Sequence, residues 1–251
     1  PGRGRPLPTP SPRGEGRGEG PPPDYRPRTK PPCQIPEARD PRPEVGLGER
    51  IMAESLAIID RELGPEPSDP AERAVVRRMI HASADFDFAR AVRFGPGAIA
   101  AALRALRSGA TIVTDVGMLR AGISTAMAGP LGVRVVCGLD LVEGAIPPDL
   151  TRTAAGVRRA AAELGDGIML AVGNAPTALI EAIRLVEQEG WRPACLVGIP
   201  VGFVGVEESK QRLAEQRHVP FLTSLGRKGG TAVTAAAINA LLELAGAKAE
   251  R

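Results

Sequence analysis

Residues 168–189 read IMLAVGNAPTALIEAIRLVEQE, and this stretch decides the fold. Five apolar residues come first, then a loop of small residues, then apolar residues at helical intervals after Pro176. An unbroken apolar run is typical of a strand that is buried on both faces, and proline favours the first turn of a helix. The stretch therefore predicts a buried strand, a tight loop and a helix, which is the repeating unit of a parallel α/β sheet.

Four further apolar runs have the same character, and helix-like segments separate them. The runs are Thr111–Thr114, Val133–Cys137, Ala194–Ile199 and Pro220–Ser224, and the segments are 152–164, 206–217 and 230–245. Five strands that alternate with helices predict a three-layer, flavodoxin-like doubly wound parallel sheet of five strands, in the order 2-1-3-4-5. Ligands of such sheets bind beyond the carboxyl ends of the strands. We therefore expect the site to be lined by the loops Asp115–Met118, Gly173–Thr177, Pro200–Gly205 and Gly226–Thr231.

The segment ahead of the first predicted strand contains two predicted helices and one of the two histidines. Residues 49–63 have apolar residues at helical spacing, and Asp69 and Pro70 begin a second helix, at whose C-terminal end His81 lies. An imidazole without a Ser, Cys or metal-ligand partner nearby suits the transfer of a single proton, and the helix dipole favours its charged form. His81 is therefore the candidate acid, whereas His218, at the amino end of the fifth strand, is interpreted as structural.

Residues 1–48 differ in composition from the rest of the chain. They contain 14 of the 25 prolines, and their 9 Lys and Arg against 6 Asp and Glu account for the net charge of +3. We expect residues 1–45 to form a disordered low-complexity tail and residues 46–251 to form the α/β domain. The small excess of positive charge argues against a nucleic-acid-binding protein, although contact between the basic tail and anionic partners is an alternative.

The apolar runs and the cysteines indicate the cellular compartment in which the protein is expected to function. No apolar stretch reaches the ~20 residues of a membrane span. We therefore expect a soluble, cytoplasmic protein that binds no membrane. The three cysteines, Cys33, Cys137 and Cys195, are widely spaced and have no second Cys or His at ligand distance, so we expect reduced structural thiols.

Two of the loops have features that suit an anionic ligand. Asn174 is predicted to cap a helix that begins near Pro176, which leaves free backbone N–H groups for a carboxylate or phosphate. The loop around Arg227 and Lys228 joins two cations to glycines that allow close approach of a ligand. It is not a nucleotide-binding P-loop, because Gly229 follows Lys228 where such a loop needs Ser or Thr. The alternatives are a plain helix start and a solvated turn.

Two charged residues near these loops also have two interpretations. Asp115, at the end of the first predicted strand, is either a functional group or a capping carboxylate. Lys210, one turn into the helix that follows the fourth strand, either reaches the ligand or is an ordinary exposed lysine. The sequence leaves both alternatives open.

Taken together, these stretches resemble the precorrin-8X methylmutase family, also called precorrin isomerase, and especially its cobalt-precorrin-8 branch. The matching segments are Arg78–His81, Gly109–Asp115, Met118, Ala121–Ile123, Thr151–Arg152, Gly173–Leu179, Pro200–Lys210 and Gly226–Gly230. The resemblance implies a homodimeric isomerase of cobalamin biosynthesis that moves a methyl group between adjacent carbons of ring C in a corrin precursor. It implies that His81 is the acid that assists this sigmatropic shift, and that the protein holds no cofactor and no metal.

The resemblance also implies a tetrapyrrole substrate with acetate and propionate groups. Such a substrate requires cations and N–H donors around an apolar floor. The expected substrate-binding residues are Ser55, Asp115, Met118, Arg152, Asn174, Thr177, Val201, Phe203, Lys210, Arg227, Lys228 and Gly229. Gly117 and the pair Ser124-Thr125 depart from the family pattern, which predicts that one basic or polar contact is missing.

Two other classes of protein remain as alternatives. A tetrapyrrole carrier would bind the corrinoid without turnover and pass it to the next enzyme. A nucleotide-binding regulator would use the same doubly wound scaffold, but no Gly-x-Gly-x-x-Gly turn follows the first strand.

Overall fold

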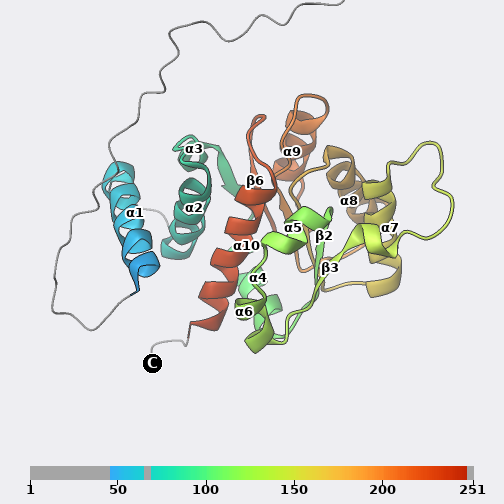
Figure 1. The fold of residues 1–251 in the computed structure, drawn as a ribbon. Helices are drawn as coiled ribbons and strands as arrows, with labels where there is room; N and C mark the ends of the chain where they lie inside the picture. The colour runs from blue at the N-terminus through green and yellow to red at the C-terminus, as the bar shows by residue number, and fades with distance from the viewer. Residues whose placement is uncertain (1–45, 65–68, 248–251) are drawn as a thin grey trace, which may run out of the picture. The chain divides into compact units, whose positions relative to one another are not determined.

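A six-stranded mixed sheet forms the centre of the computed structural model, which describes residues 46–64 and 69–247 (Figure 1). The strands are β1 (Val92–Phe94), β2 (Ile112–Thr114), β3 (Val135–Cys137), β4 (Met169–Val172), β5 (Cys195–Gly198) and β6 (Phe221–Ser224). Their order across the sheet is β1-β6-β5-β4-β2-β3. Strands β2 to β6 are parallel, whereas β1 pairs antiparallel with β6 and places Val92 opposite Ser224.

The prediction of a purely parallel sheet of five strands is wrong in one respect. Each parallel strand lies inside its predicted run, and these five strands follow the predicted relative order. However, β1 adds a sixth, antiparallel strand at one edge. It has only three residues, of which Arg93 is exposed, and so short a pattern cannot be distinguished from a loop in the sequence. The predicted tail of residues 1–45 lies outside the described residues.

Helices cover both faces of the sheet. They are α1 (Leu47–Leu63), α2 (Pro70–Ser83), α3 (Phe88–Ala91), α4 (Ala98–Arg107), α5 (Gly117–Gly122), α6 (Thr125–Ala128), α7 (Arg152–Leu164), α8 (Pro176–Gln188), α9 (Val206–Glu215) and α10 (Thr231–Gly246), with 3-10 turns at Gly129–Leu131 and Gly138–Leu141. The predicted helices correspond to α1, α2 and α7 to α10. None of the helices in the described ranges is long and apolar enough to cross a membrane.

Alternate apolar residues of β2, β4 and β5 enter two separate cores, which accounts for the three layers. Met169 and Ala171 of β4 pack with α2, α4 and α10, whereas Leu170 and Val172 pack with α7, α8 and α9. Successive side chains of a strand point to opposite faces, so a strand with both faces covered is largely apolar. Figure 1 shows α1 on the outer side of α2, away from the sheet.

The ends of α2 are fixed by local interactions that the sequence suggests. The Asp69 carboxylate accepts hydrogen bonds from the N–H groups of Ala71 at 2.8 Å and Glu72 at 3.2 Å, and Pro70 is in the first turn. At the other end, Ala84 adopts a left-handed conformation with φ 53°. The helix therefore stops directly after the turn that contains His81, as the sequence predicts.

Candidate functional site

The carboxyl ends of the parallel strands bring most of the expected site residues to one edge of the sheet. Asp115 follows β2, Asn174 follows β4, the loop of residues 199–205 follows β5, and the loop of residues 225–230 follows β6. Arg152 begins α7, which leads back to the amino end of β4, so the start of α7 lies at this same edge. We call this edge the carboxyl edge.

Asp115 organises the loop that follows β4. Its Oδ1 accepts a hydrogen bond from the N–H of Gly173 at 3.1 Å, and its Oδ2 accepts from the N–H groups of Asn174 and Ala175, both at 2.8 Å. The side chain is buried, and burial raises the pKa of Asp115, while the backbone N–H donors act in the opposite direction. The carboxyl group of Asp115 therefore points into the protein and stabilises the conformation of the loop after β4.

The prediction that Asn174 caps α8 is wrong. The residue before the helix is Ala175, no side-chain cap bond is present, and Asn174 is exposed. Asp115, from a neighbouring strand, instead binds the N–H groups of the three residues that precede the helix. The sequence around residue 174 gives no sign of this, because the acceptor lies nearly sixty residues earlier in the chain.

Hydroxyl groups join the first turns of α7 and α8, beside the exposed Arg152. The Oγ1 atoms of Thr151 and Thr177 are 2.8 Å apart, and Thr151 also accepts from the N–H of Ala154 at 3.2 Å. The next residue, Arg152, is exposed, and its guanidinium forms no ion pair with any residue in the described ranges. Thr177 and Arg152 therefore present a hydroxyl group and a positive charge at the carboxyl edge.

Large apolar side chains are exposed at the same edge. Phe203 and Val204, after β5, are 83% and 89% exposed, and Met118 of α5 is 72% exposed. Val201 is also exposed, and the sulfur of Met118 lies 3.2 Å from Oγ1 of Thr231 at the start of α10. Apolar groups of this size in a polar surrounding are typical of a binding surface.

The two cations of the loop after β6 have different partners. The Arg227 guanidinium lies 5.8 Å from the centre of the Phe203 ring, and its Nε donates to Glu207 at 3.2 Å. Lys228 Nζ is 2.7 Å from Asp85 and 2.5 Å from Asp87. The hydrogen bonds that Lys228 donates to these aspartates raise the pKa of Lys228, and the bond to Asp85 lowers the pKa of Asp85. An open pocket of about 400 Å³ lies beside this cluster, between the loop and the start of α3.

Sequence reasoning missed Asp85 and Asp87. Both follow the candidate acid closely, at the end of its helix, and that position was the available signal. Lys228 was expected to bind an anionic ligand, and in this structure its ammonium group already lies between these two carboxylates. Glu207 similarly pairs with Arg227, although that pair is exposed on both sides.

Lys210 departs from the expectation of a solvent-exposed or ligand-facing lysine. Its side chain is fully buried, and Nζ donates to the carbonyl of Lys228 at 2.8 Å and to Oγ of Ser224 at 3.4 Å. Burial lowers the pKa of Lys210 to about 8. The ammonium therefore contacts the inner side of the loop after β6. Gly229 of that loop packs against the backbone of Ile199 and Pro200.

His81 lies half-buried in the last turn of α2. Its ring has no hydrogen-bond partner within the part of the chain that the structure describes. The chain then turns at Ala84 to Asp85, which Lys228 binds, so this end of α2 is joined to the carboxyl edge. Ser55 lies on the adjacent helix α1, and its hydroxyl donates to the carbonyl of Ile51 at 2.7 Å.

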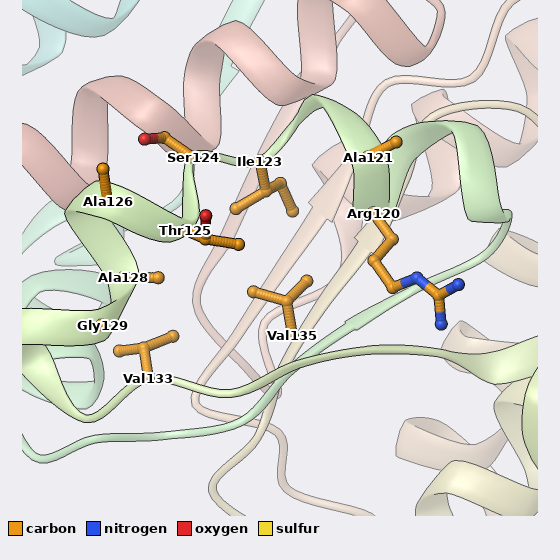
Figure 2. Close-up of a pocket in the computed structure, with 10 residues that line it drawn as sticks. All are labelled: Arg120, Ala121, Ile123, Ser124, Thr125, Ala126, Ala128, Gly129, Val133 and Val135. Atoms are coloured by element: carbon orange, nitrogen blue, oxygen red, sulfur yellow. The ribbon is translucent and has the colours of Figure 1, made fainter.

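Two of the three residues that depart from the family pattern line a different pocket. Ser124 and Thr125 border an open pocket of about 610 Å³ under α5 and α6, together with Arg120, Ile123 and Val135 (Figure 2). The side chains of Arg120 and Asp140 form an ion pair at one end of it. A Cβ atom built at Gly117, where α5 begins, would meet nothing within 4 Å. The space for a larger residue at position 117 is therefore open.

The fold and the site define an α/β protein with a candidate ligand-binding edge at the carboxyl ends of its parallel strands. Residues 50–244 match the profile of the precorrin-8X methylmutase family. The chain belongs to this family.

Individual relatives agree with the family match. The chain is 42% identical over 200 residues to the cobalt-precorrin-8 methylmutase of Priestia megaterium, which covers 78% of this chain and 88% of that protein. It is 39% identical over 200 residues to the precorrin-8X methylmutase of Pseudomonas aeruginosa, with 77% and 94% covered. A crystal structure of precorrin-8X methylmutase from Thermus thermophilus matches with a TM-score of 0.70 and 41% identity, covering 78% of this chain and 96% of that chain.

Proposed function

We propose that this protein is an isomerase of cobalamin biosynthesis that shifts a methyl group between adjacent ring C carbons of precorrin-8X or cobalt-precorrin-8. The observation that carries the proposal is the family match over residues 50–244, which includes His81 and the four loops of the carboxyl edge. Relatives whose names specify the metal-free and the cobalt-containing substrates are both about 40% identical to this chain, so the proposal includes both forms.

The chemistry requires a proton donor and no external oxidant. The bond from the methyl group to one ring carbon breaks as the bond to the neighbouring carbon forms, so substrate and product are isomers. His81 protonates or hydrogen-bonds the ring C region during the shift and recovers its proton afterwards. Its half-buried ring, without a partner among the described residues, supports this assignment.

The exposed groups of the carboxyl edge are assigned to substrate binding. Arg152 and Arg227 pair with acetate or propionate groups of the macrocycle, because guanidinium groups bind carboxylates in bidentate geometry. Met118, Val201 and Phe203 form the apolar floor beneath the ring system. Further contacts come from Ser55, Asn174, Thr177, Lys228 and the backbone of Gly229. The other two expected residues, Asp115 and Lys210, are buried and support the loops.

The test is turnover of both substrates by the purified protein, followed by absorption. Methyl migration shifts the chromophore of precorrin-8X or cobalt-precorrin-8. His81→Ala should slow the change by about 100-fold or more, since general acid catalysis contributes about this much. His218→Ala is the matched control, because His218 precedes β6 at the opposite edge. A stable coloured complex that releases ligand with an unchanged spectrum would identify a corrinoid carrier and reject the isomerase.

We also propose that the enzyme is a cytoplasmic homodimer of flavodoxin-like subunits. The parallel strand order supports the flavodoxin-like assignment. An apolar stripe on α1 supports association, since Leu47, Ile51 and Ile58 are 52%, 53% and 38% exposed. Sedimentation equilibrium tests the assembly, and replacement of Ile51 by Glu should weaken it. A monomer across the accessible concentration range would reject the dimer while leaving the methylmutase proposal intact.

A further inference from the structure

Lys210 is a buried cation that no carboxylate neutralises directly. Its side chain is fully buried, and no carboxylate among the described residues contacts its ammonium group. Its donors go instead to the Lys228 carbonyl at 2.8 Å and the Ser224 hydroxyl at 3.4 Å. Burying an ammonium without a counter-charge opposes folding, so global stability alone does not explain a lysine here.

The Lys228 carbonyl is the point at which the loop after β6 is held from its inner side. Ser224 Oγ also donates to this carbonyl, at 3.1 Å. The N–H of Gly230 donates to the carbonyl of Ile199 at 2.8 Å, and a Cβ atom at Gly229 would lie 2.4 Å from the same carbonyl oxygen. Lys210 belongs to the helix that follows the loop after β5. It therefore fastens the loop after β6 against the loop after β5.

These two loops carry the exposed pair formed by Phe203 and Arg227. The guanidinium of Arg227 lies over the Phe203 ring, 5.8 Å from its centre. Arg227 immediately precedes the residue whose carbonyl Lys210 binds. Any displacement of that carbonyl therefore moves Arg227 with respect to Phe203.

We propose that Lys210 is a positioning residue that fixes the loop of Arg227 above Phe203, so that Arg227 is preorganised for a carboxylate of the macrocyclic substrate. The identity of this ligand rests on the proposed function, whereas the ordering of the loop does not. Lys210 acts through the Lys228 carbonyl and does not itself touch substrate, because its ammonium group is buried beneath the loop. Preorganisation of this kind improves binding by removing the cost of ordering the loop.

The test compares Lys210→Met with Gln211→Met in the full chain. Methionine keeps the apolar stem of Lys210 and removes its donors, and Gln211 is an exposed neighbour on the same helix. Trypsin cleavage after Arg227 and Lys228, measured by mass spectrometry, reports the loop without any substrate. We expect Lys210→Met to accelerate this cleavage about tenfold, the effect of losing one charged hydrogen bond. Gln211→Met should behave as the unaltered protein does.

Kinetics and a second variant separate positioning from a general structural role. Lys210→Met should raise KM by about tenfold with little change in kcat, because Arg227 loses its preorganised position. Ser224→Ala, which keeps the ammonium, should show the same pattern in weaker form. Urea unfolding is followed in parallel, since removing a buried charge leaves global stability similar or higher. Unchanged loop cleavage in Lys210→Met would overturn the proposal, and accelerated cleavage with an unchanged KM would overturn the role in binding.

Failure of the methylmutase proposal itself would give a different set of results. If the unaltered protein moves no methyl group, the loop readout still shows whether Lys210 orders the loop, and the affinity for the corrinoid replaces KM as the second measurement. Affinity that is equal in Lys210→Met and Gln211→Met would then reject Lys210 as a positioning residue for any carboxylate ligand of this loop.

Discussion

Lys228 and Asp85 join the loop after β6 to the residues that follow His81, with Nζ and Oδ2 2.7 Å apart. Asp87 provides a second carboxylate to the same ammonium. The connection is partly exposed to solvent, so it contributes little to global stability. Its effect is local, because it restrains the end of the helix that presents His81.

Replacement of Lys228 by Met should therefore loosen this end of α2. We expect faster amide hydrogen exchange in residues 82–91 and a lower kcat, with a change in unfolding free energy below about 1 kcal/mol. Asp140→Asn, which removes the distant exposed pair with Arg120, is the control and should leave exchange in residues 82–91 unaltered. Equal exchange in both variants would show that Lys228 does not restrain the helix.

Asp115, and not Asn174, provides the side-chain oxygen atoms that bind the N–H groups of the loop after β4. Asp115→Asn should destabilise the protein by about 2 kcal/mol or more, because it removes a buried charged acceptor from three N–H groups. Asn174→Ala should change stability by less than about 0.5 kcal/mol, since this exposed side chain caps nothing. Urea unfolding of the two variants measures the difference. A larger loss for Asn174→Ala would contradict the assignment.

Glu181 is a buried carboxylate that joins α8 to α7. Burial opposes its ionisation, but hydrogen bonds from Arg184 and Arg158 outweigh burial and lower the pKa of Glu181 below 4.5. Because the folded pKa is depressed, this stabilisation is fully present above pH 4.5 and is lost as the pH falls through the folded pKa. Glu181→Gln should cost about 1–3 kcal/mol at pH 7. The exposed Glu163, paired with Arg159, gives the control Glu163→Gln, which should cost almost nothing.

The same two variants test the pH dependence. The difference in unfolding free energy between Glu181→Gln and the unaltered protein should shrink as the pH falls below 4.5. Chemical denaturation at several pH values between 3.5 and 7 measures it. A difference that stays constant with pH would show that the charge of Glu181 is not what holds the two helices.

Lys210 predicts a pH dependence of the same sense as that of Glu181, but in an alkaline range. Burial lowers its pKa to about 8, so the folded protein releases the proton at a lower pH than the unfolded chain does. Since the unfolded chain then binds more protons, this group makes stability rise between about pH 8 and pH 10.4. The unaltered protein should therefore gain stability relative to Lys210→Met over this range. Denaturation at pH 7.5, 8.5 and 9.5 checks it, and Gln211→Met should show a constant offset.

Ala84 is the one non-glycine residue in the described ranges with a positive φ, at 53°. Ala84→Gly should stabilise the protein by about 1 kcal/mol, because glycine adopts the left-handed conformation without steric cost. Ala82→Gly, two residues earlier inside α2, should instead destabilise it by about 0.5–1 kcal/mol. Thermal unfolding of both variants measures these two changes in stability. Destabilisation by both would show that the turn after His81 is not strained.

The pattern of apolar and capping residues along the chain was sufficient to predict the buried strands and the start of α2. The run from Ile168 to Val172 predicts a strand buried on both faces, and Asp69 with Pro70 predicts the start of α2; both are confirmed. Strand β1 was missed because its three residues gain their structure from pairing with β6, not from their own sequence. Partners distant in the chain explain the contacts that local sequence could not reveal. Asp115 binds the N–H groups ahead of α8, where Asn174 was expected to be the cap, and Asp85 pairs with Lys228.

Strand β1 also determines when the candidate site is assembled. Val92 pairs with Ser224, so the strand that follows the segment of His81 acquires its place in the sheet only after β6 has been synthesised. Contacts between such distant parts of the chain form slowly, since closing a long loop costs entropy first. Chains that stop short of β6 therefore lack the partner of β1, and the candidate acid His81 reaches its final environment only once β6 is present.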